Sequence, residues 1–142
     1  MAMPTAGKVF VVTGAGNGIG RQVALELVEQ GATVAAVDIN AEGLEQTAAE
    51  AGSRISTHVL DISDSEAVAA FPQIVIDTHG AVDGLFNIAG IAQSVGTTLD
   101  ITPEHVDRLM TINFRGTVEM TQAFIPHLSA RVPDTHPRKV AV

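Results

Sequence analysis

The feature that most constrains the fold is a glycine-rich turn, TGAGNGIG (residues 13–20), which directly follows the short apolar run KVFVV. A continuous apolar run that ends at a turn predicts a strand buried on both faces. After the turn, apolar residues recur at helical spacing as far as Gly31, which is a typical helix stop. A strand, a tight turn and a helix are therefore expected in this order, as at the start of a βαβ unit.

The same alternation continues along the chain, with three more predicted strands at residues 33–38, 54–61 and 82–90. Predicted helices cover residues 41–51, the stretch from Ser63 towards His79, and residues 103–128. Right-handed crossovers then favour one doubly wound, Rossmann-like α/β domain over residues 1–142, with parallel strand order 3-2-1-4-5. The fifth strand would be RKVAV at residues 138–142, so the sheet is expected to be incomplete on its C-terminal side.

Helix-capping residues sharpen these boundaries. Asn40 is expected to cap the helix at 41–51, and Ser63 with Glu66 three residues later resembles a capping box. Pro72 lies inside the helix that follows, so we expect it to kink or divide that helix. Thr102-Pro103 is a cap followed by proline at the first helical position.

Composition excludes several classes of function. The net charge of −8 disfavours nucleic acid and anionic membranes as partners, and without cysteine there is neither a disulfide nor a thiolate metal site. No apolar run is long enough to span a bilayer, and the N-terminus does not resemble a signal peptide, so a cytoplasmic location is expected. The five histidines lack metal-ligand spacing and are expected at the surface or in loops, with no metal bound.

The glycines of the turn suit a phosphate group. Gly14, Gly18 and Gly20 stand where a tight turn, a close approach to phosphate and close helix packing leave no room for a side chain. The following helix presents free N–H groups to a pyrophosphate. An ordinary strand-to-helix turn that uses glycine is the alternative.

Asp38 ends the second predicted strand, roughly 20 positions after the glycines. Its carboxylate suits the hydroxyls of an adenosine ribose and would repel a 2′-phosphate. No Arg or Lys lies at residues 15–17, beside the place that such a phosphate would take. Both observations favour NAD over NADP, while a helix-capping aspartate near Asn40 is the alternative.

Taken together, these motifs resemble the short-chain dehydrogenase/reductase family over residues 8–128. The family pattern is a T-G-x-x-x-G-x-G turn, an acidic residue after the second strand, Asp after the third, N-x-A-G after the fourth, and Asn in the fifth helix. The matching positions are Thr13, Gly14, Gly18, Gly20, Asp38, Asp61, Asn87, Ala89, Gly90 and Asn113.

The resemblance implies an NAD site. The cofactor-binding positions would be Thr13, Gly14, Asn17, Gly18, Ile19, Gly20, Asp38, Ile39, Asp61, Ile62, Asn87, Ala89 and Gly90. In the family, Asp61 would accept from the adenine amino group with help from the Ile62 backbone, although a turn aspartate before Ser63 is nearly as good an interpretation. The segment 87–90 would brace the central strand and approach the nicotinamide-side ribose, or simply form a turn at the end of a strand.

Asn113 is the single catalytic candidate. In the family, this asparagine takes part in a proton relay through water to the catalytic lysine. Its position also stands out without the family, because it falls on a helical stripe with apolar neighbours and a buried amide must be hydrogen-bonded. Bonding to the backbone of the fourth strand is the structural alternative. The stripe comprises Val106, Met110, Asn113, Thr117, Met120 and Phe124.

The resemblance ends at the catalytic residues. The family carries a serine after the fifth strand and then a Tyr-x-x-x-Lys pair, but this sequence has no tyrosine, and Lys139 precedes the core of the predicted strand. A break in the native sequence near Pro137 is one explanation. The chain is expected to be the dinucleotide-binding part of an oxidoreductase acting on a small alcohol or ketone; a non-catalytic NAD-binding module and an inactive remnant are the alternatives.

Self-association is the expected consequence of an incomplete fold. The long helix at 103–128 would expose an apolar side, and the fifth strand would be an open sheet edge that can pair with another chain. The side chains expected to be uncovered on the helix are Met110, Phe114, Val118 and Phe124.

Overall fold

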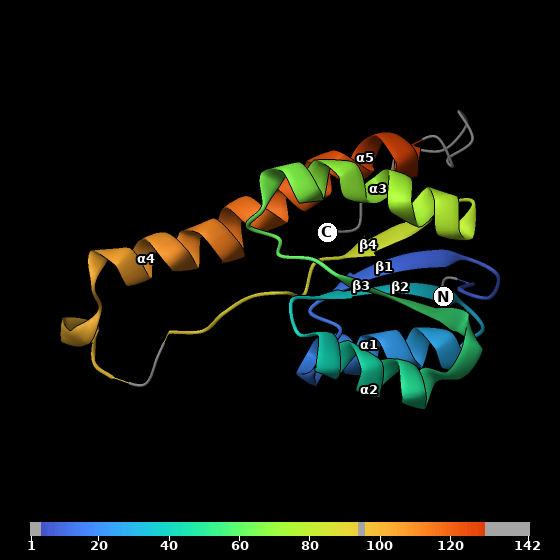
Figure 1. The fold of residues 1–142 in the computed structure, drawn as a ribbon, viewed down its shortest axis with the longest axis horizontal. Helices are drawn as coiled ribbons and strands as arrows, with labels where there is room; N and C mark the ends of the chain where they lie inside the picture. Colours follow the sequence, from blue (N-terminus) through green and yellow to red (C-terminus); the bar gives the residue numbers. More distant parts are fainter. Residues whose placement is uncertain (1–3, 94–95, 130–142) are drawn as a thin grey trace.

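The computed structural model describes residues 4–93 and 96–129 of the chain (Figure 1). Four parallel strands form one sheet in the order β3-β2-β1-β4. The strands are β1 (Val9–Thr13), β2 (Thr33–Asp38), β3 (Ile55–Val59) and β4 (Gly84–Phe86). The α/β class and the first four places of the predicted strand order are confirmed. The fifth predicted strand, at residues 138–142, lies outside the described residues.

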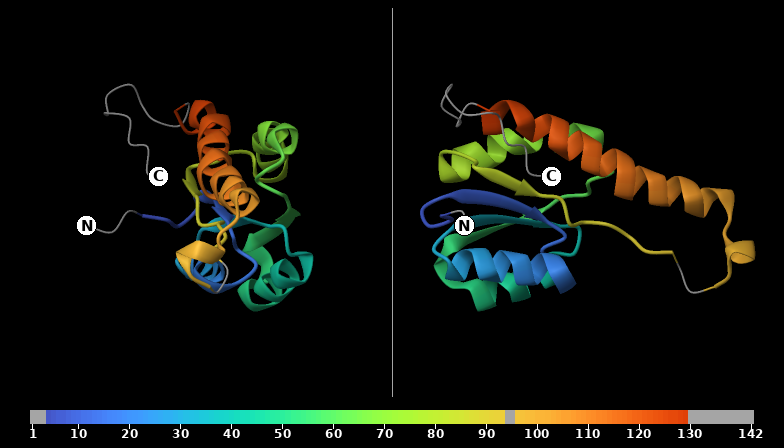
Figure 2. Two further views of the ribbon diagram at one scale, coloured as in Figure 1. Left: turned by 90° about the vertical axis from the view of Figure 1, so that its left-hand side faces the viewer. Right: turned by 180° about the vertical axis from the view of Figure 1, so that it is seen from behind.

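Helices cover both faces of the sheet (Figures 1 and 2). Helices α1 (Gly18–Glu29) and α2 (Ala41–Ala51) lie on one face, while α3 (Ser65–His79) and α5 (Thr117–Ser129) lie on the other. Short 3₁₀ turns occupy Gly52–Arg54 and Thr98–Asp100. The central strands β1 and β2 are covered on both faces, and they are almost wholly apolar, as parallel strands in such folds usually are.

Alternate residues of β1 supply two separate cores. Phe10 and Val12 pack with Leu27 under α1 and α2, whereas Val11 packs with Phe71 under α3 and α5. This alternation is the two-residue period of a strand. The chain therefore has one apolar layer on each side of the sheet, and the strand ends meet at one rim.

Two predicted caps are confirmed and one is wrong. Asn40 accepts a hydrogen bond at the start of α2, and Thr102 does the same at the start of the long helix. For α3, however, the cap is Asp64, whose carboxylate accepts from the N–H groups two and three residues later, at 3.1 Å each. The predicted Ser63 cap fails because the hydroxyl and N–H of Ser63 both donate to Asp61.

Pro72 does not divide α3, which runs from Ser65 to His79 without interruption. Proline lacks an N–H, so the helix forgoes one intrahelical hydrogen bond at this position. Pro72 is buried between the buried side chains Val68, Phe71 and Val75. Apolar packing against the sheet therefore stabilises α3 across Pro72, although proline usually interrupts a helix.

The last helix is not one regular α-helix. It begins as α4 (Pro103–Leu109), passes through a π-helical segment at Met110–Gly116, and continues as α5. In Figure 1, α4 projects beyond the sheet, and none of its residues is buried. The sequence predicted the helix and its start, but it did not predict the π segment.

The predicted single apolar stripe on this helix is wrong. Met120 and Phe124 are fully buried, whereas Val106 and Met110 are 45% and 53% exposed. A π turn holds more residues than an α turn, so a 3.6-residue repeat does not continue through it. The prediction that Phe124 is uncovered is also wrong, because its ring packs against Phe71 at 5.9 Å between centroids.

Within residues 4–93 and 96–129, no helix is both long enough and apolar enough to cross a membrane.

Candidate functional site

A cavity of about 630 Å³ opens at the rim where the strands end. Its walls come from the glycine-rich turn, the end of β2, the segments after β3 and β4, the end of α4, and the start of the π segment. Every predicted cofactor-binding residue lines it except Gly18 and Asn87. Parallel α/β sheets bind their ligands at this rim, so the cavity is the candidate site.

The turn is built so that side chains would not fit. Gly14 has a φ of +70°, and a Cβ there would lie 2.9 Å from the backbone of Ala89. A Cβ on Gly20 would collide with the carbonyl oxygen of Gly14. Gly18 has open space around it, but its φ of +50° favours glycine. The three glycines thus serve a close approach, close helix packing and a left-handed backbone.

Thr13 joins the turn to the opposite wall. Its hydroxyl accepts from the N–H groups of Ile88 and Ala89, both at 3.0 Å, and donates to the carbonyl of Phe86 at 3.3 Å. These three bonds use the full capacity of a hydroxyl group. Thr13 is only 1% exposed. It therefore shapes the cavity by holding the end of β1 against the segment that follows β4.

Asp38 fastens the glycine-rich turn to the end of β2. Its Oδ2 accepts from the N–H of Gly16 at 2.9 Å, and its Oδ1 accepts from the N–H of Asn40 at 2.9 Å. Asn40, not Asp38, caps α2, so the alternative of a helix-capping aspartate is wrong. A Cβ on Gly16 would lie 2.8 Å from the carboxylate. Gly16 is thus a further glycine that the site requires, and its importance did not emerge from the sequence.

Two exposed isoleucines flank this part of the cavity. Ile19 is 74% exposed and Ile39 is 66% exposed, and both line the cavity wall. Exposed aliphatic side chains at the mouth of a cavity offer apolar surface to a ligand.

Asp61 lines the cavity after β3, and its Oδ1 accepts from both the hydroxyl and the N–H of Ser63, at 2.7 and 2.9 Å. These bonds, the hydroxyl first, hold the pKa of Asp61 below its ordinary value, and the charge of Arg108 adds to the effect. The turn-aspartate interpretation is therefore present in the structure. Arg108, which also lines the cavity, was not predicted from the sequence.

Asn87 points away from the cavity. Its amide donates to the hydroxyl of Thr121 on α5 at 3.0 Å, so its side chain braces β4 against that helix. Ala89 and Gly90, from the same motif, do line the cavity. The predicted bracing of the central strand comes instead from the N–H groups of Ile88 and Ala89, which donate to Thr13 of β1, while the approach of this segment to a ribose stays a prediction.

Asn113 lies in the π segment and does not line the cavity. Its amide pairs with both backbone groups of Ile91, accepting from the N–H and donating to the carbonyl, each at 2.8 Å. Bonding of Asn113 to the backbone of the fourth strand was the structural alternative. The observed partner, Ile91, is a backbone partner that lies after β4 and not within it. The expectation that this amide is buried is wrong, because Asn113 is exposed.

All four histidines among the described residues are partly buried and lie on a strand or a helix. His58 and His79 are partly buried, and each places its Nε2 2.7 Å from the hydroxyl of Ser56. The expectation that all five are surface or loop residues is therefore wrong for the four described histidines, of which His58 and His79 lie on β3 and α3 and the other two on α4 and α5. His136 lies outside the described residues. Among the described residues, no group of three or more His, Asp or Glu side chains is arranged to hold a metal.

The sequence pattern of the short chain dehydrogenase family matches residues 8–133. This chain belongs to that family. It is 39% identical over 127 residues to SadH of Mycobacterium tuberculosis, covering 87% of this chain and 46% of that protein. The chain thus spans about half the length of SadH.

Solved structures agree on the fold. A 3-ketoacyl-(acyl-carrier-protein) reductase from Brucella melitensis, complexed with NADH, matches with a TM-score of 0.83 and 36% identity over 87% of this chain and 51% of its own. A metagenomic short-chain oxidoreductase in complex with NADP matches at 0.81 and 34%, over 88% and 58%. Family members therefore bind nicotinamide dinucleotides, and both cofactor types occur among the similar structures.

Proposed function

We propose that this chain binds NAD(H) in preference to NADP(H), as the dinucleotide-binding part of an oxidoreductase that acts on an alcohol or ketone. The observation that carries the proposal is the Asp38 carboxylate, held at the cavity by two backbone N–H groups. A carboxylate in this place can accept from ribose hydroxyls and repels a phosphate on the same ribose.

The residues present suit such a cofactor. The turn at Gly14 and Gly20 would take the pyrophosphate, because no side chain blocks the backbone there. Ile19 and Ile39 offer apolar surface, and we propose that they flank the adenosine half. Asp61 has one oxygen engaged by Ser63 and stays ionised well below neutral pH, so it can accept from the adenine amino group.

When bound, the nicotinamide ring supplies the hydride acceptor or donor, and the protein binds and orients it. The 142 residues contain no tyrosine, so a general acid/base of that type is not among them. We therefore propose that this chain binds the dinucleotide without turning over substrate by itself. Asn113 is proposed to act through the backbone of Ile91, which lines the cavity.

The proposal is tested by titrating the 142-residue chain with NADH and NADPH, and by repeating both titrations with Asp38→Asn. The wild-type chain is expected to bind NADH at least ~10-fold more tightly, because one repulsive charge pair is worth more than about 1.4 kcal/mol in such a site. Asp38→Asn should remove most of that preference. Equal affinities in the wild-type chain would refute the NAD preference, and binding of neither would refute the dinucleotide site.

We also propose self-association through the long helix. Met110, Phe114 and Val118 lie one helical turn apart and are 53%, 62% and 38% exposed. Sedimentation velocity on Phe114→Glu tests this, since a charge on that face should shift an oligomer towards monomer. An unchanged sedimentation coefficient in an oligomeric sample would place the interface elsewhere.

A further inference from the structure

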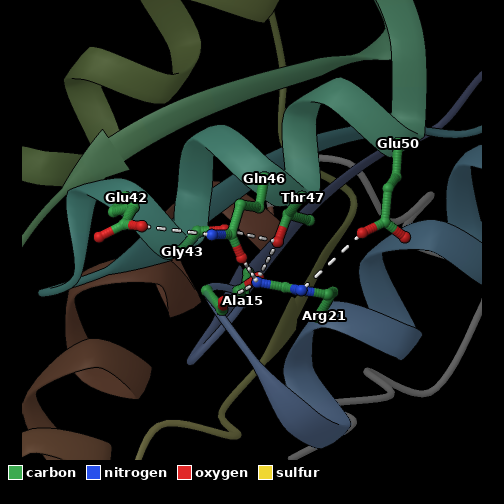
Figure 3. A network of polar contacts seen from close by, with 8 residues as sticks. Ala15, Arg21, Glu42, Gly43, Gln46, Thr47 and Glu50 are labelled. Atoms are coloured by element: carbon green, nitrogen blue, oxygen red, sulfur yellow. Dashed lines mark hydrogen bonds and ion pairs between the residues drawn. The ribbon is translucent and has the colours of Figure 1, made fainter.

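Two side chains outside the cavity hold the carbonyl oxygens of the glycine-rich turn (Figure 3). The hydroxyl of Thr47, on α2, lies 2.8 Å from the carbonyl oxygen of Ala15. A guanidinium nitrogen of Arg21, on α1, donates to the carbonyl oxygen of Gly16 at 2.6 Å. Both oxygens are thereby directed towards α2. A carbonyl oxygen facing an anion would repel it, so this orientation matters for a phosphate site.

Helix α2 presses directly on the turn at this point. A Cβ on Gly43 would lie 2.5 Å from the carbonyl oxygen of Gly16, so α2 needs glycine here despite a cost of about 1 kcal/mol relative to alanine within a helix. The hydroxyl of Thr47 and the guanidinium of Arg21 also reach the carbonyl of Gly43, at 3.0 and 3.3 Å. The turn, α1 and α2 therefore meet in one polar network.

Arg21 is anchored within this network. The same guanidinium nitrogen lies 3.1 Å from the side-chain oxygen of Gln46, and the other terminal nitrogen pairs with Glu50 at 3.8 Å. Thr47 is fully buried, and the side chain of Arg21 is only 20% exposed. Hydrogen bonds in such sheltered places resist competition from water, so the carbonyl orientation is firmly held.

Peptide geometry transmits this orientation to the cavity. The C=O and N–H of a trans peptide point in opposite directions, and no cis peptide bond occurs in the described residues. The Ala15–Gly16 peptide accepts from Thr47 with its oxygen and donates to Asp38 with its N–H, at 2.9 Å. The Gly16–Asn17 peptide accepts from Arg21, which turns the Asn17 N–H away from Arg21. Asn17 lines the cavity.

We propose that Thr47 and Arg21 are positioning residues for the dinucleotide. Thr47 orients the Asp38 carboxylate through one peptide group, and so contributes to the choice between NAD and NADP. Arg21 orients the neighbouring peptide, and so contributes to phosphate binding without touching the phosphate. This inference rests on the proposed function of the cavity, and it assigns a different task to each residue.

The test of Thr47 is Thr47→Val, which removes the hydroxyl and keeps the shape. The affinity for NADH should fall about tenfold, the size of effect expected for one weakened charge-assisted hydrogen bond, while NADPH binding changes less. The preference for NADH over NADPH, measured as the ratio of the two affinities, should therefore decrease. Thr47→Ser should restore it. Thr78→Val is the matched control, because the Thr78 hydroxyl donates to Ile74 at 2.8 Å within α3, far from the cavity.

The test of Arg21 is Arg21→Met. Arg54→Met is the control, because it removes the same charge from an exposed residue in the 3₁₀ turn that follows α2. Arg21→Met should weaken the binding of NADH and NADPH by similar factors, so the ratio of the two affinities should stay unchanged. A merely structural role would lower the melting temperature and leave both affinities unaltered in the folded variant. That result, for either residue, would overturn its assignment.

A measurement without ligand tests the positioning role of Thr47 separately from the proposed dinucleotide binding. Amide hydrogen exchange at Gly16 should become at least about tenfold faster in Thr47→Val, because its bond to Asp38 loses support from the same peptide. Unchanged exchange would overturn the inference whether or not a dinucleotide binds. If the wild-type chain binds neither NADH nor NADPH, the proposed function fails, and the exchange result still decides whether Thr47 holds the turn.

Discussion

The two layers of helices differ in how they meet the sheet. In the layer of α1 and α2, the turn, the helix starts and Asp38 are tied together by side-chain bonds and packed without room for extra atoms. In the other layer, α5 is packed well at Met120 and Phe124, but the π segment and α4 precede it in the same long helix, and no residue of α4 is fully buried. The first layer is tied to the cavity by side-chain bonds, whereas the second also lines the cavity but ends in exposed apolar side chains.

This difference shows which parts of the fold can be predicted from short sequence patterns. Glycine turns, caps and strand alternation act over a few residues, and they dominate the first layer. The course of the long helix depends instead on what packs beside it, which a local pattern does not contain. Substitutions at single residues test this difference between the two layers, and the largest effect is expected in the long helix.

The sharpest contrast uses one substitution at two places in the same long helix. Phe124→Ala removes a fully buried ring that packs on Phe71, so it should lower the free energy of unfolding by about 3–5 kcal/mol. In the monomeric chain, at low protein concentration, Phe114→Ala removes a ring that is 62% exposed and should change the free energy of unfolding by less than about 0.5 kcal/mol. Chemical denaturation measures both, and similar losses at the two positions would contradict the contrast.

The next largest loss of stability is expected at the hydrogen bonds that join β1 to the segment after β4. Thr13→Val leaves the N–H groups of Ile88 and Ala89 without their acceptor, which should cost about 2 kcal/mol of stability. Thr13→Ser keeps the hydroxyl and is the control. Thermal and urea unfolding of the three proteins checks the prediction. A Thr13→Val protein as stable as the serine variant would mean that the hydroxyl is not needed.

The paired histidines give a smaller, pH-dependent effect. Burial lowers the pKa of His58, with a further contribution from the charge of His79, and burial also lowers the pKa of His79. The unfolded chain therefore takes up protons near its ordinary pKa, about 6.5, while the folded chain resists them. Stability should be full above pH 6.5 and should decline as the pH falls towards the folded values.

Melting temperatures measured between pH 7.5 and pH 5 test this, with His58→Gln as the comparison. Glutamine can still bond to Ser56 and does not titrate, so the variant should lose part of the pH dependence. His127→Gln, on α5, is the control. Identical pH profiles for the wild-type chain and His58→Gln would show that burial of this histidine does not matter.

Sequence patterns predicted the parts of the fold that depend on short segments. The bounds of β2 and α2, the cap at Asn40, and the strand order of the four described strands all match. Apolar runs and helix caps carry that information locally. The cap of α3 was missed because Ser63 and Asp64 are both good caps, and only the bond from Ser63 to Asp61 decides between them.

The candidate site was predictable as a set of residues and not as a set of contacts. Most of the predicted positions line one cavity, because strand ends meet at one rim of a parallel sheet. The partners of Asp38, the pairing of Asn113 with Ile91, and the network of Arg21 depend on how separate segments meet in space. No spacing in the sequence marks Thr47 or Gly43 as neighbours of the turn.

The most direct test of the central claim is a titration of the ¹⁵N-labelled chain with NADH, followed by the shifts of its backbone amides. We expect shifts in the turn from Gly14 to Gly20, at residues 38–40 and at residues 61–63, with little change at Phe114 or Val118. That result would locate dinucleotide binding at the rim where the strands end. Shifts confined to the long helix, or none at saturating NADH, would contradict the proposed site.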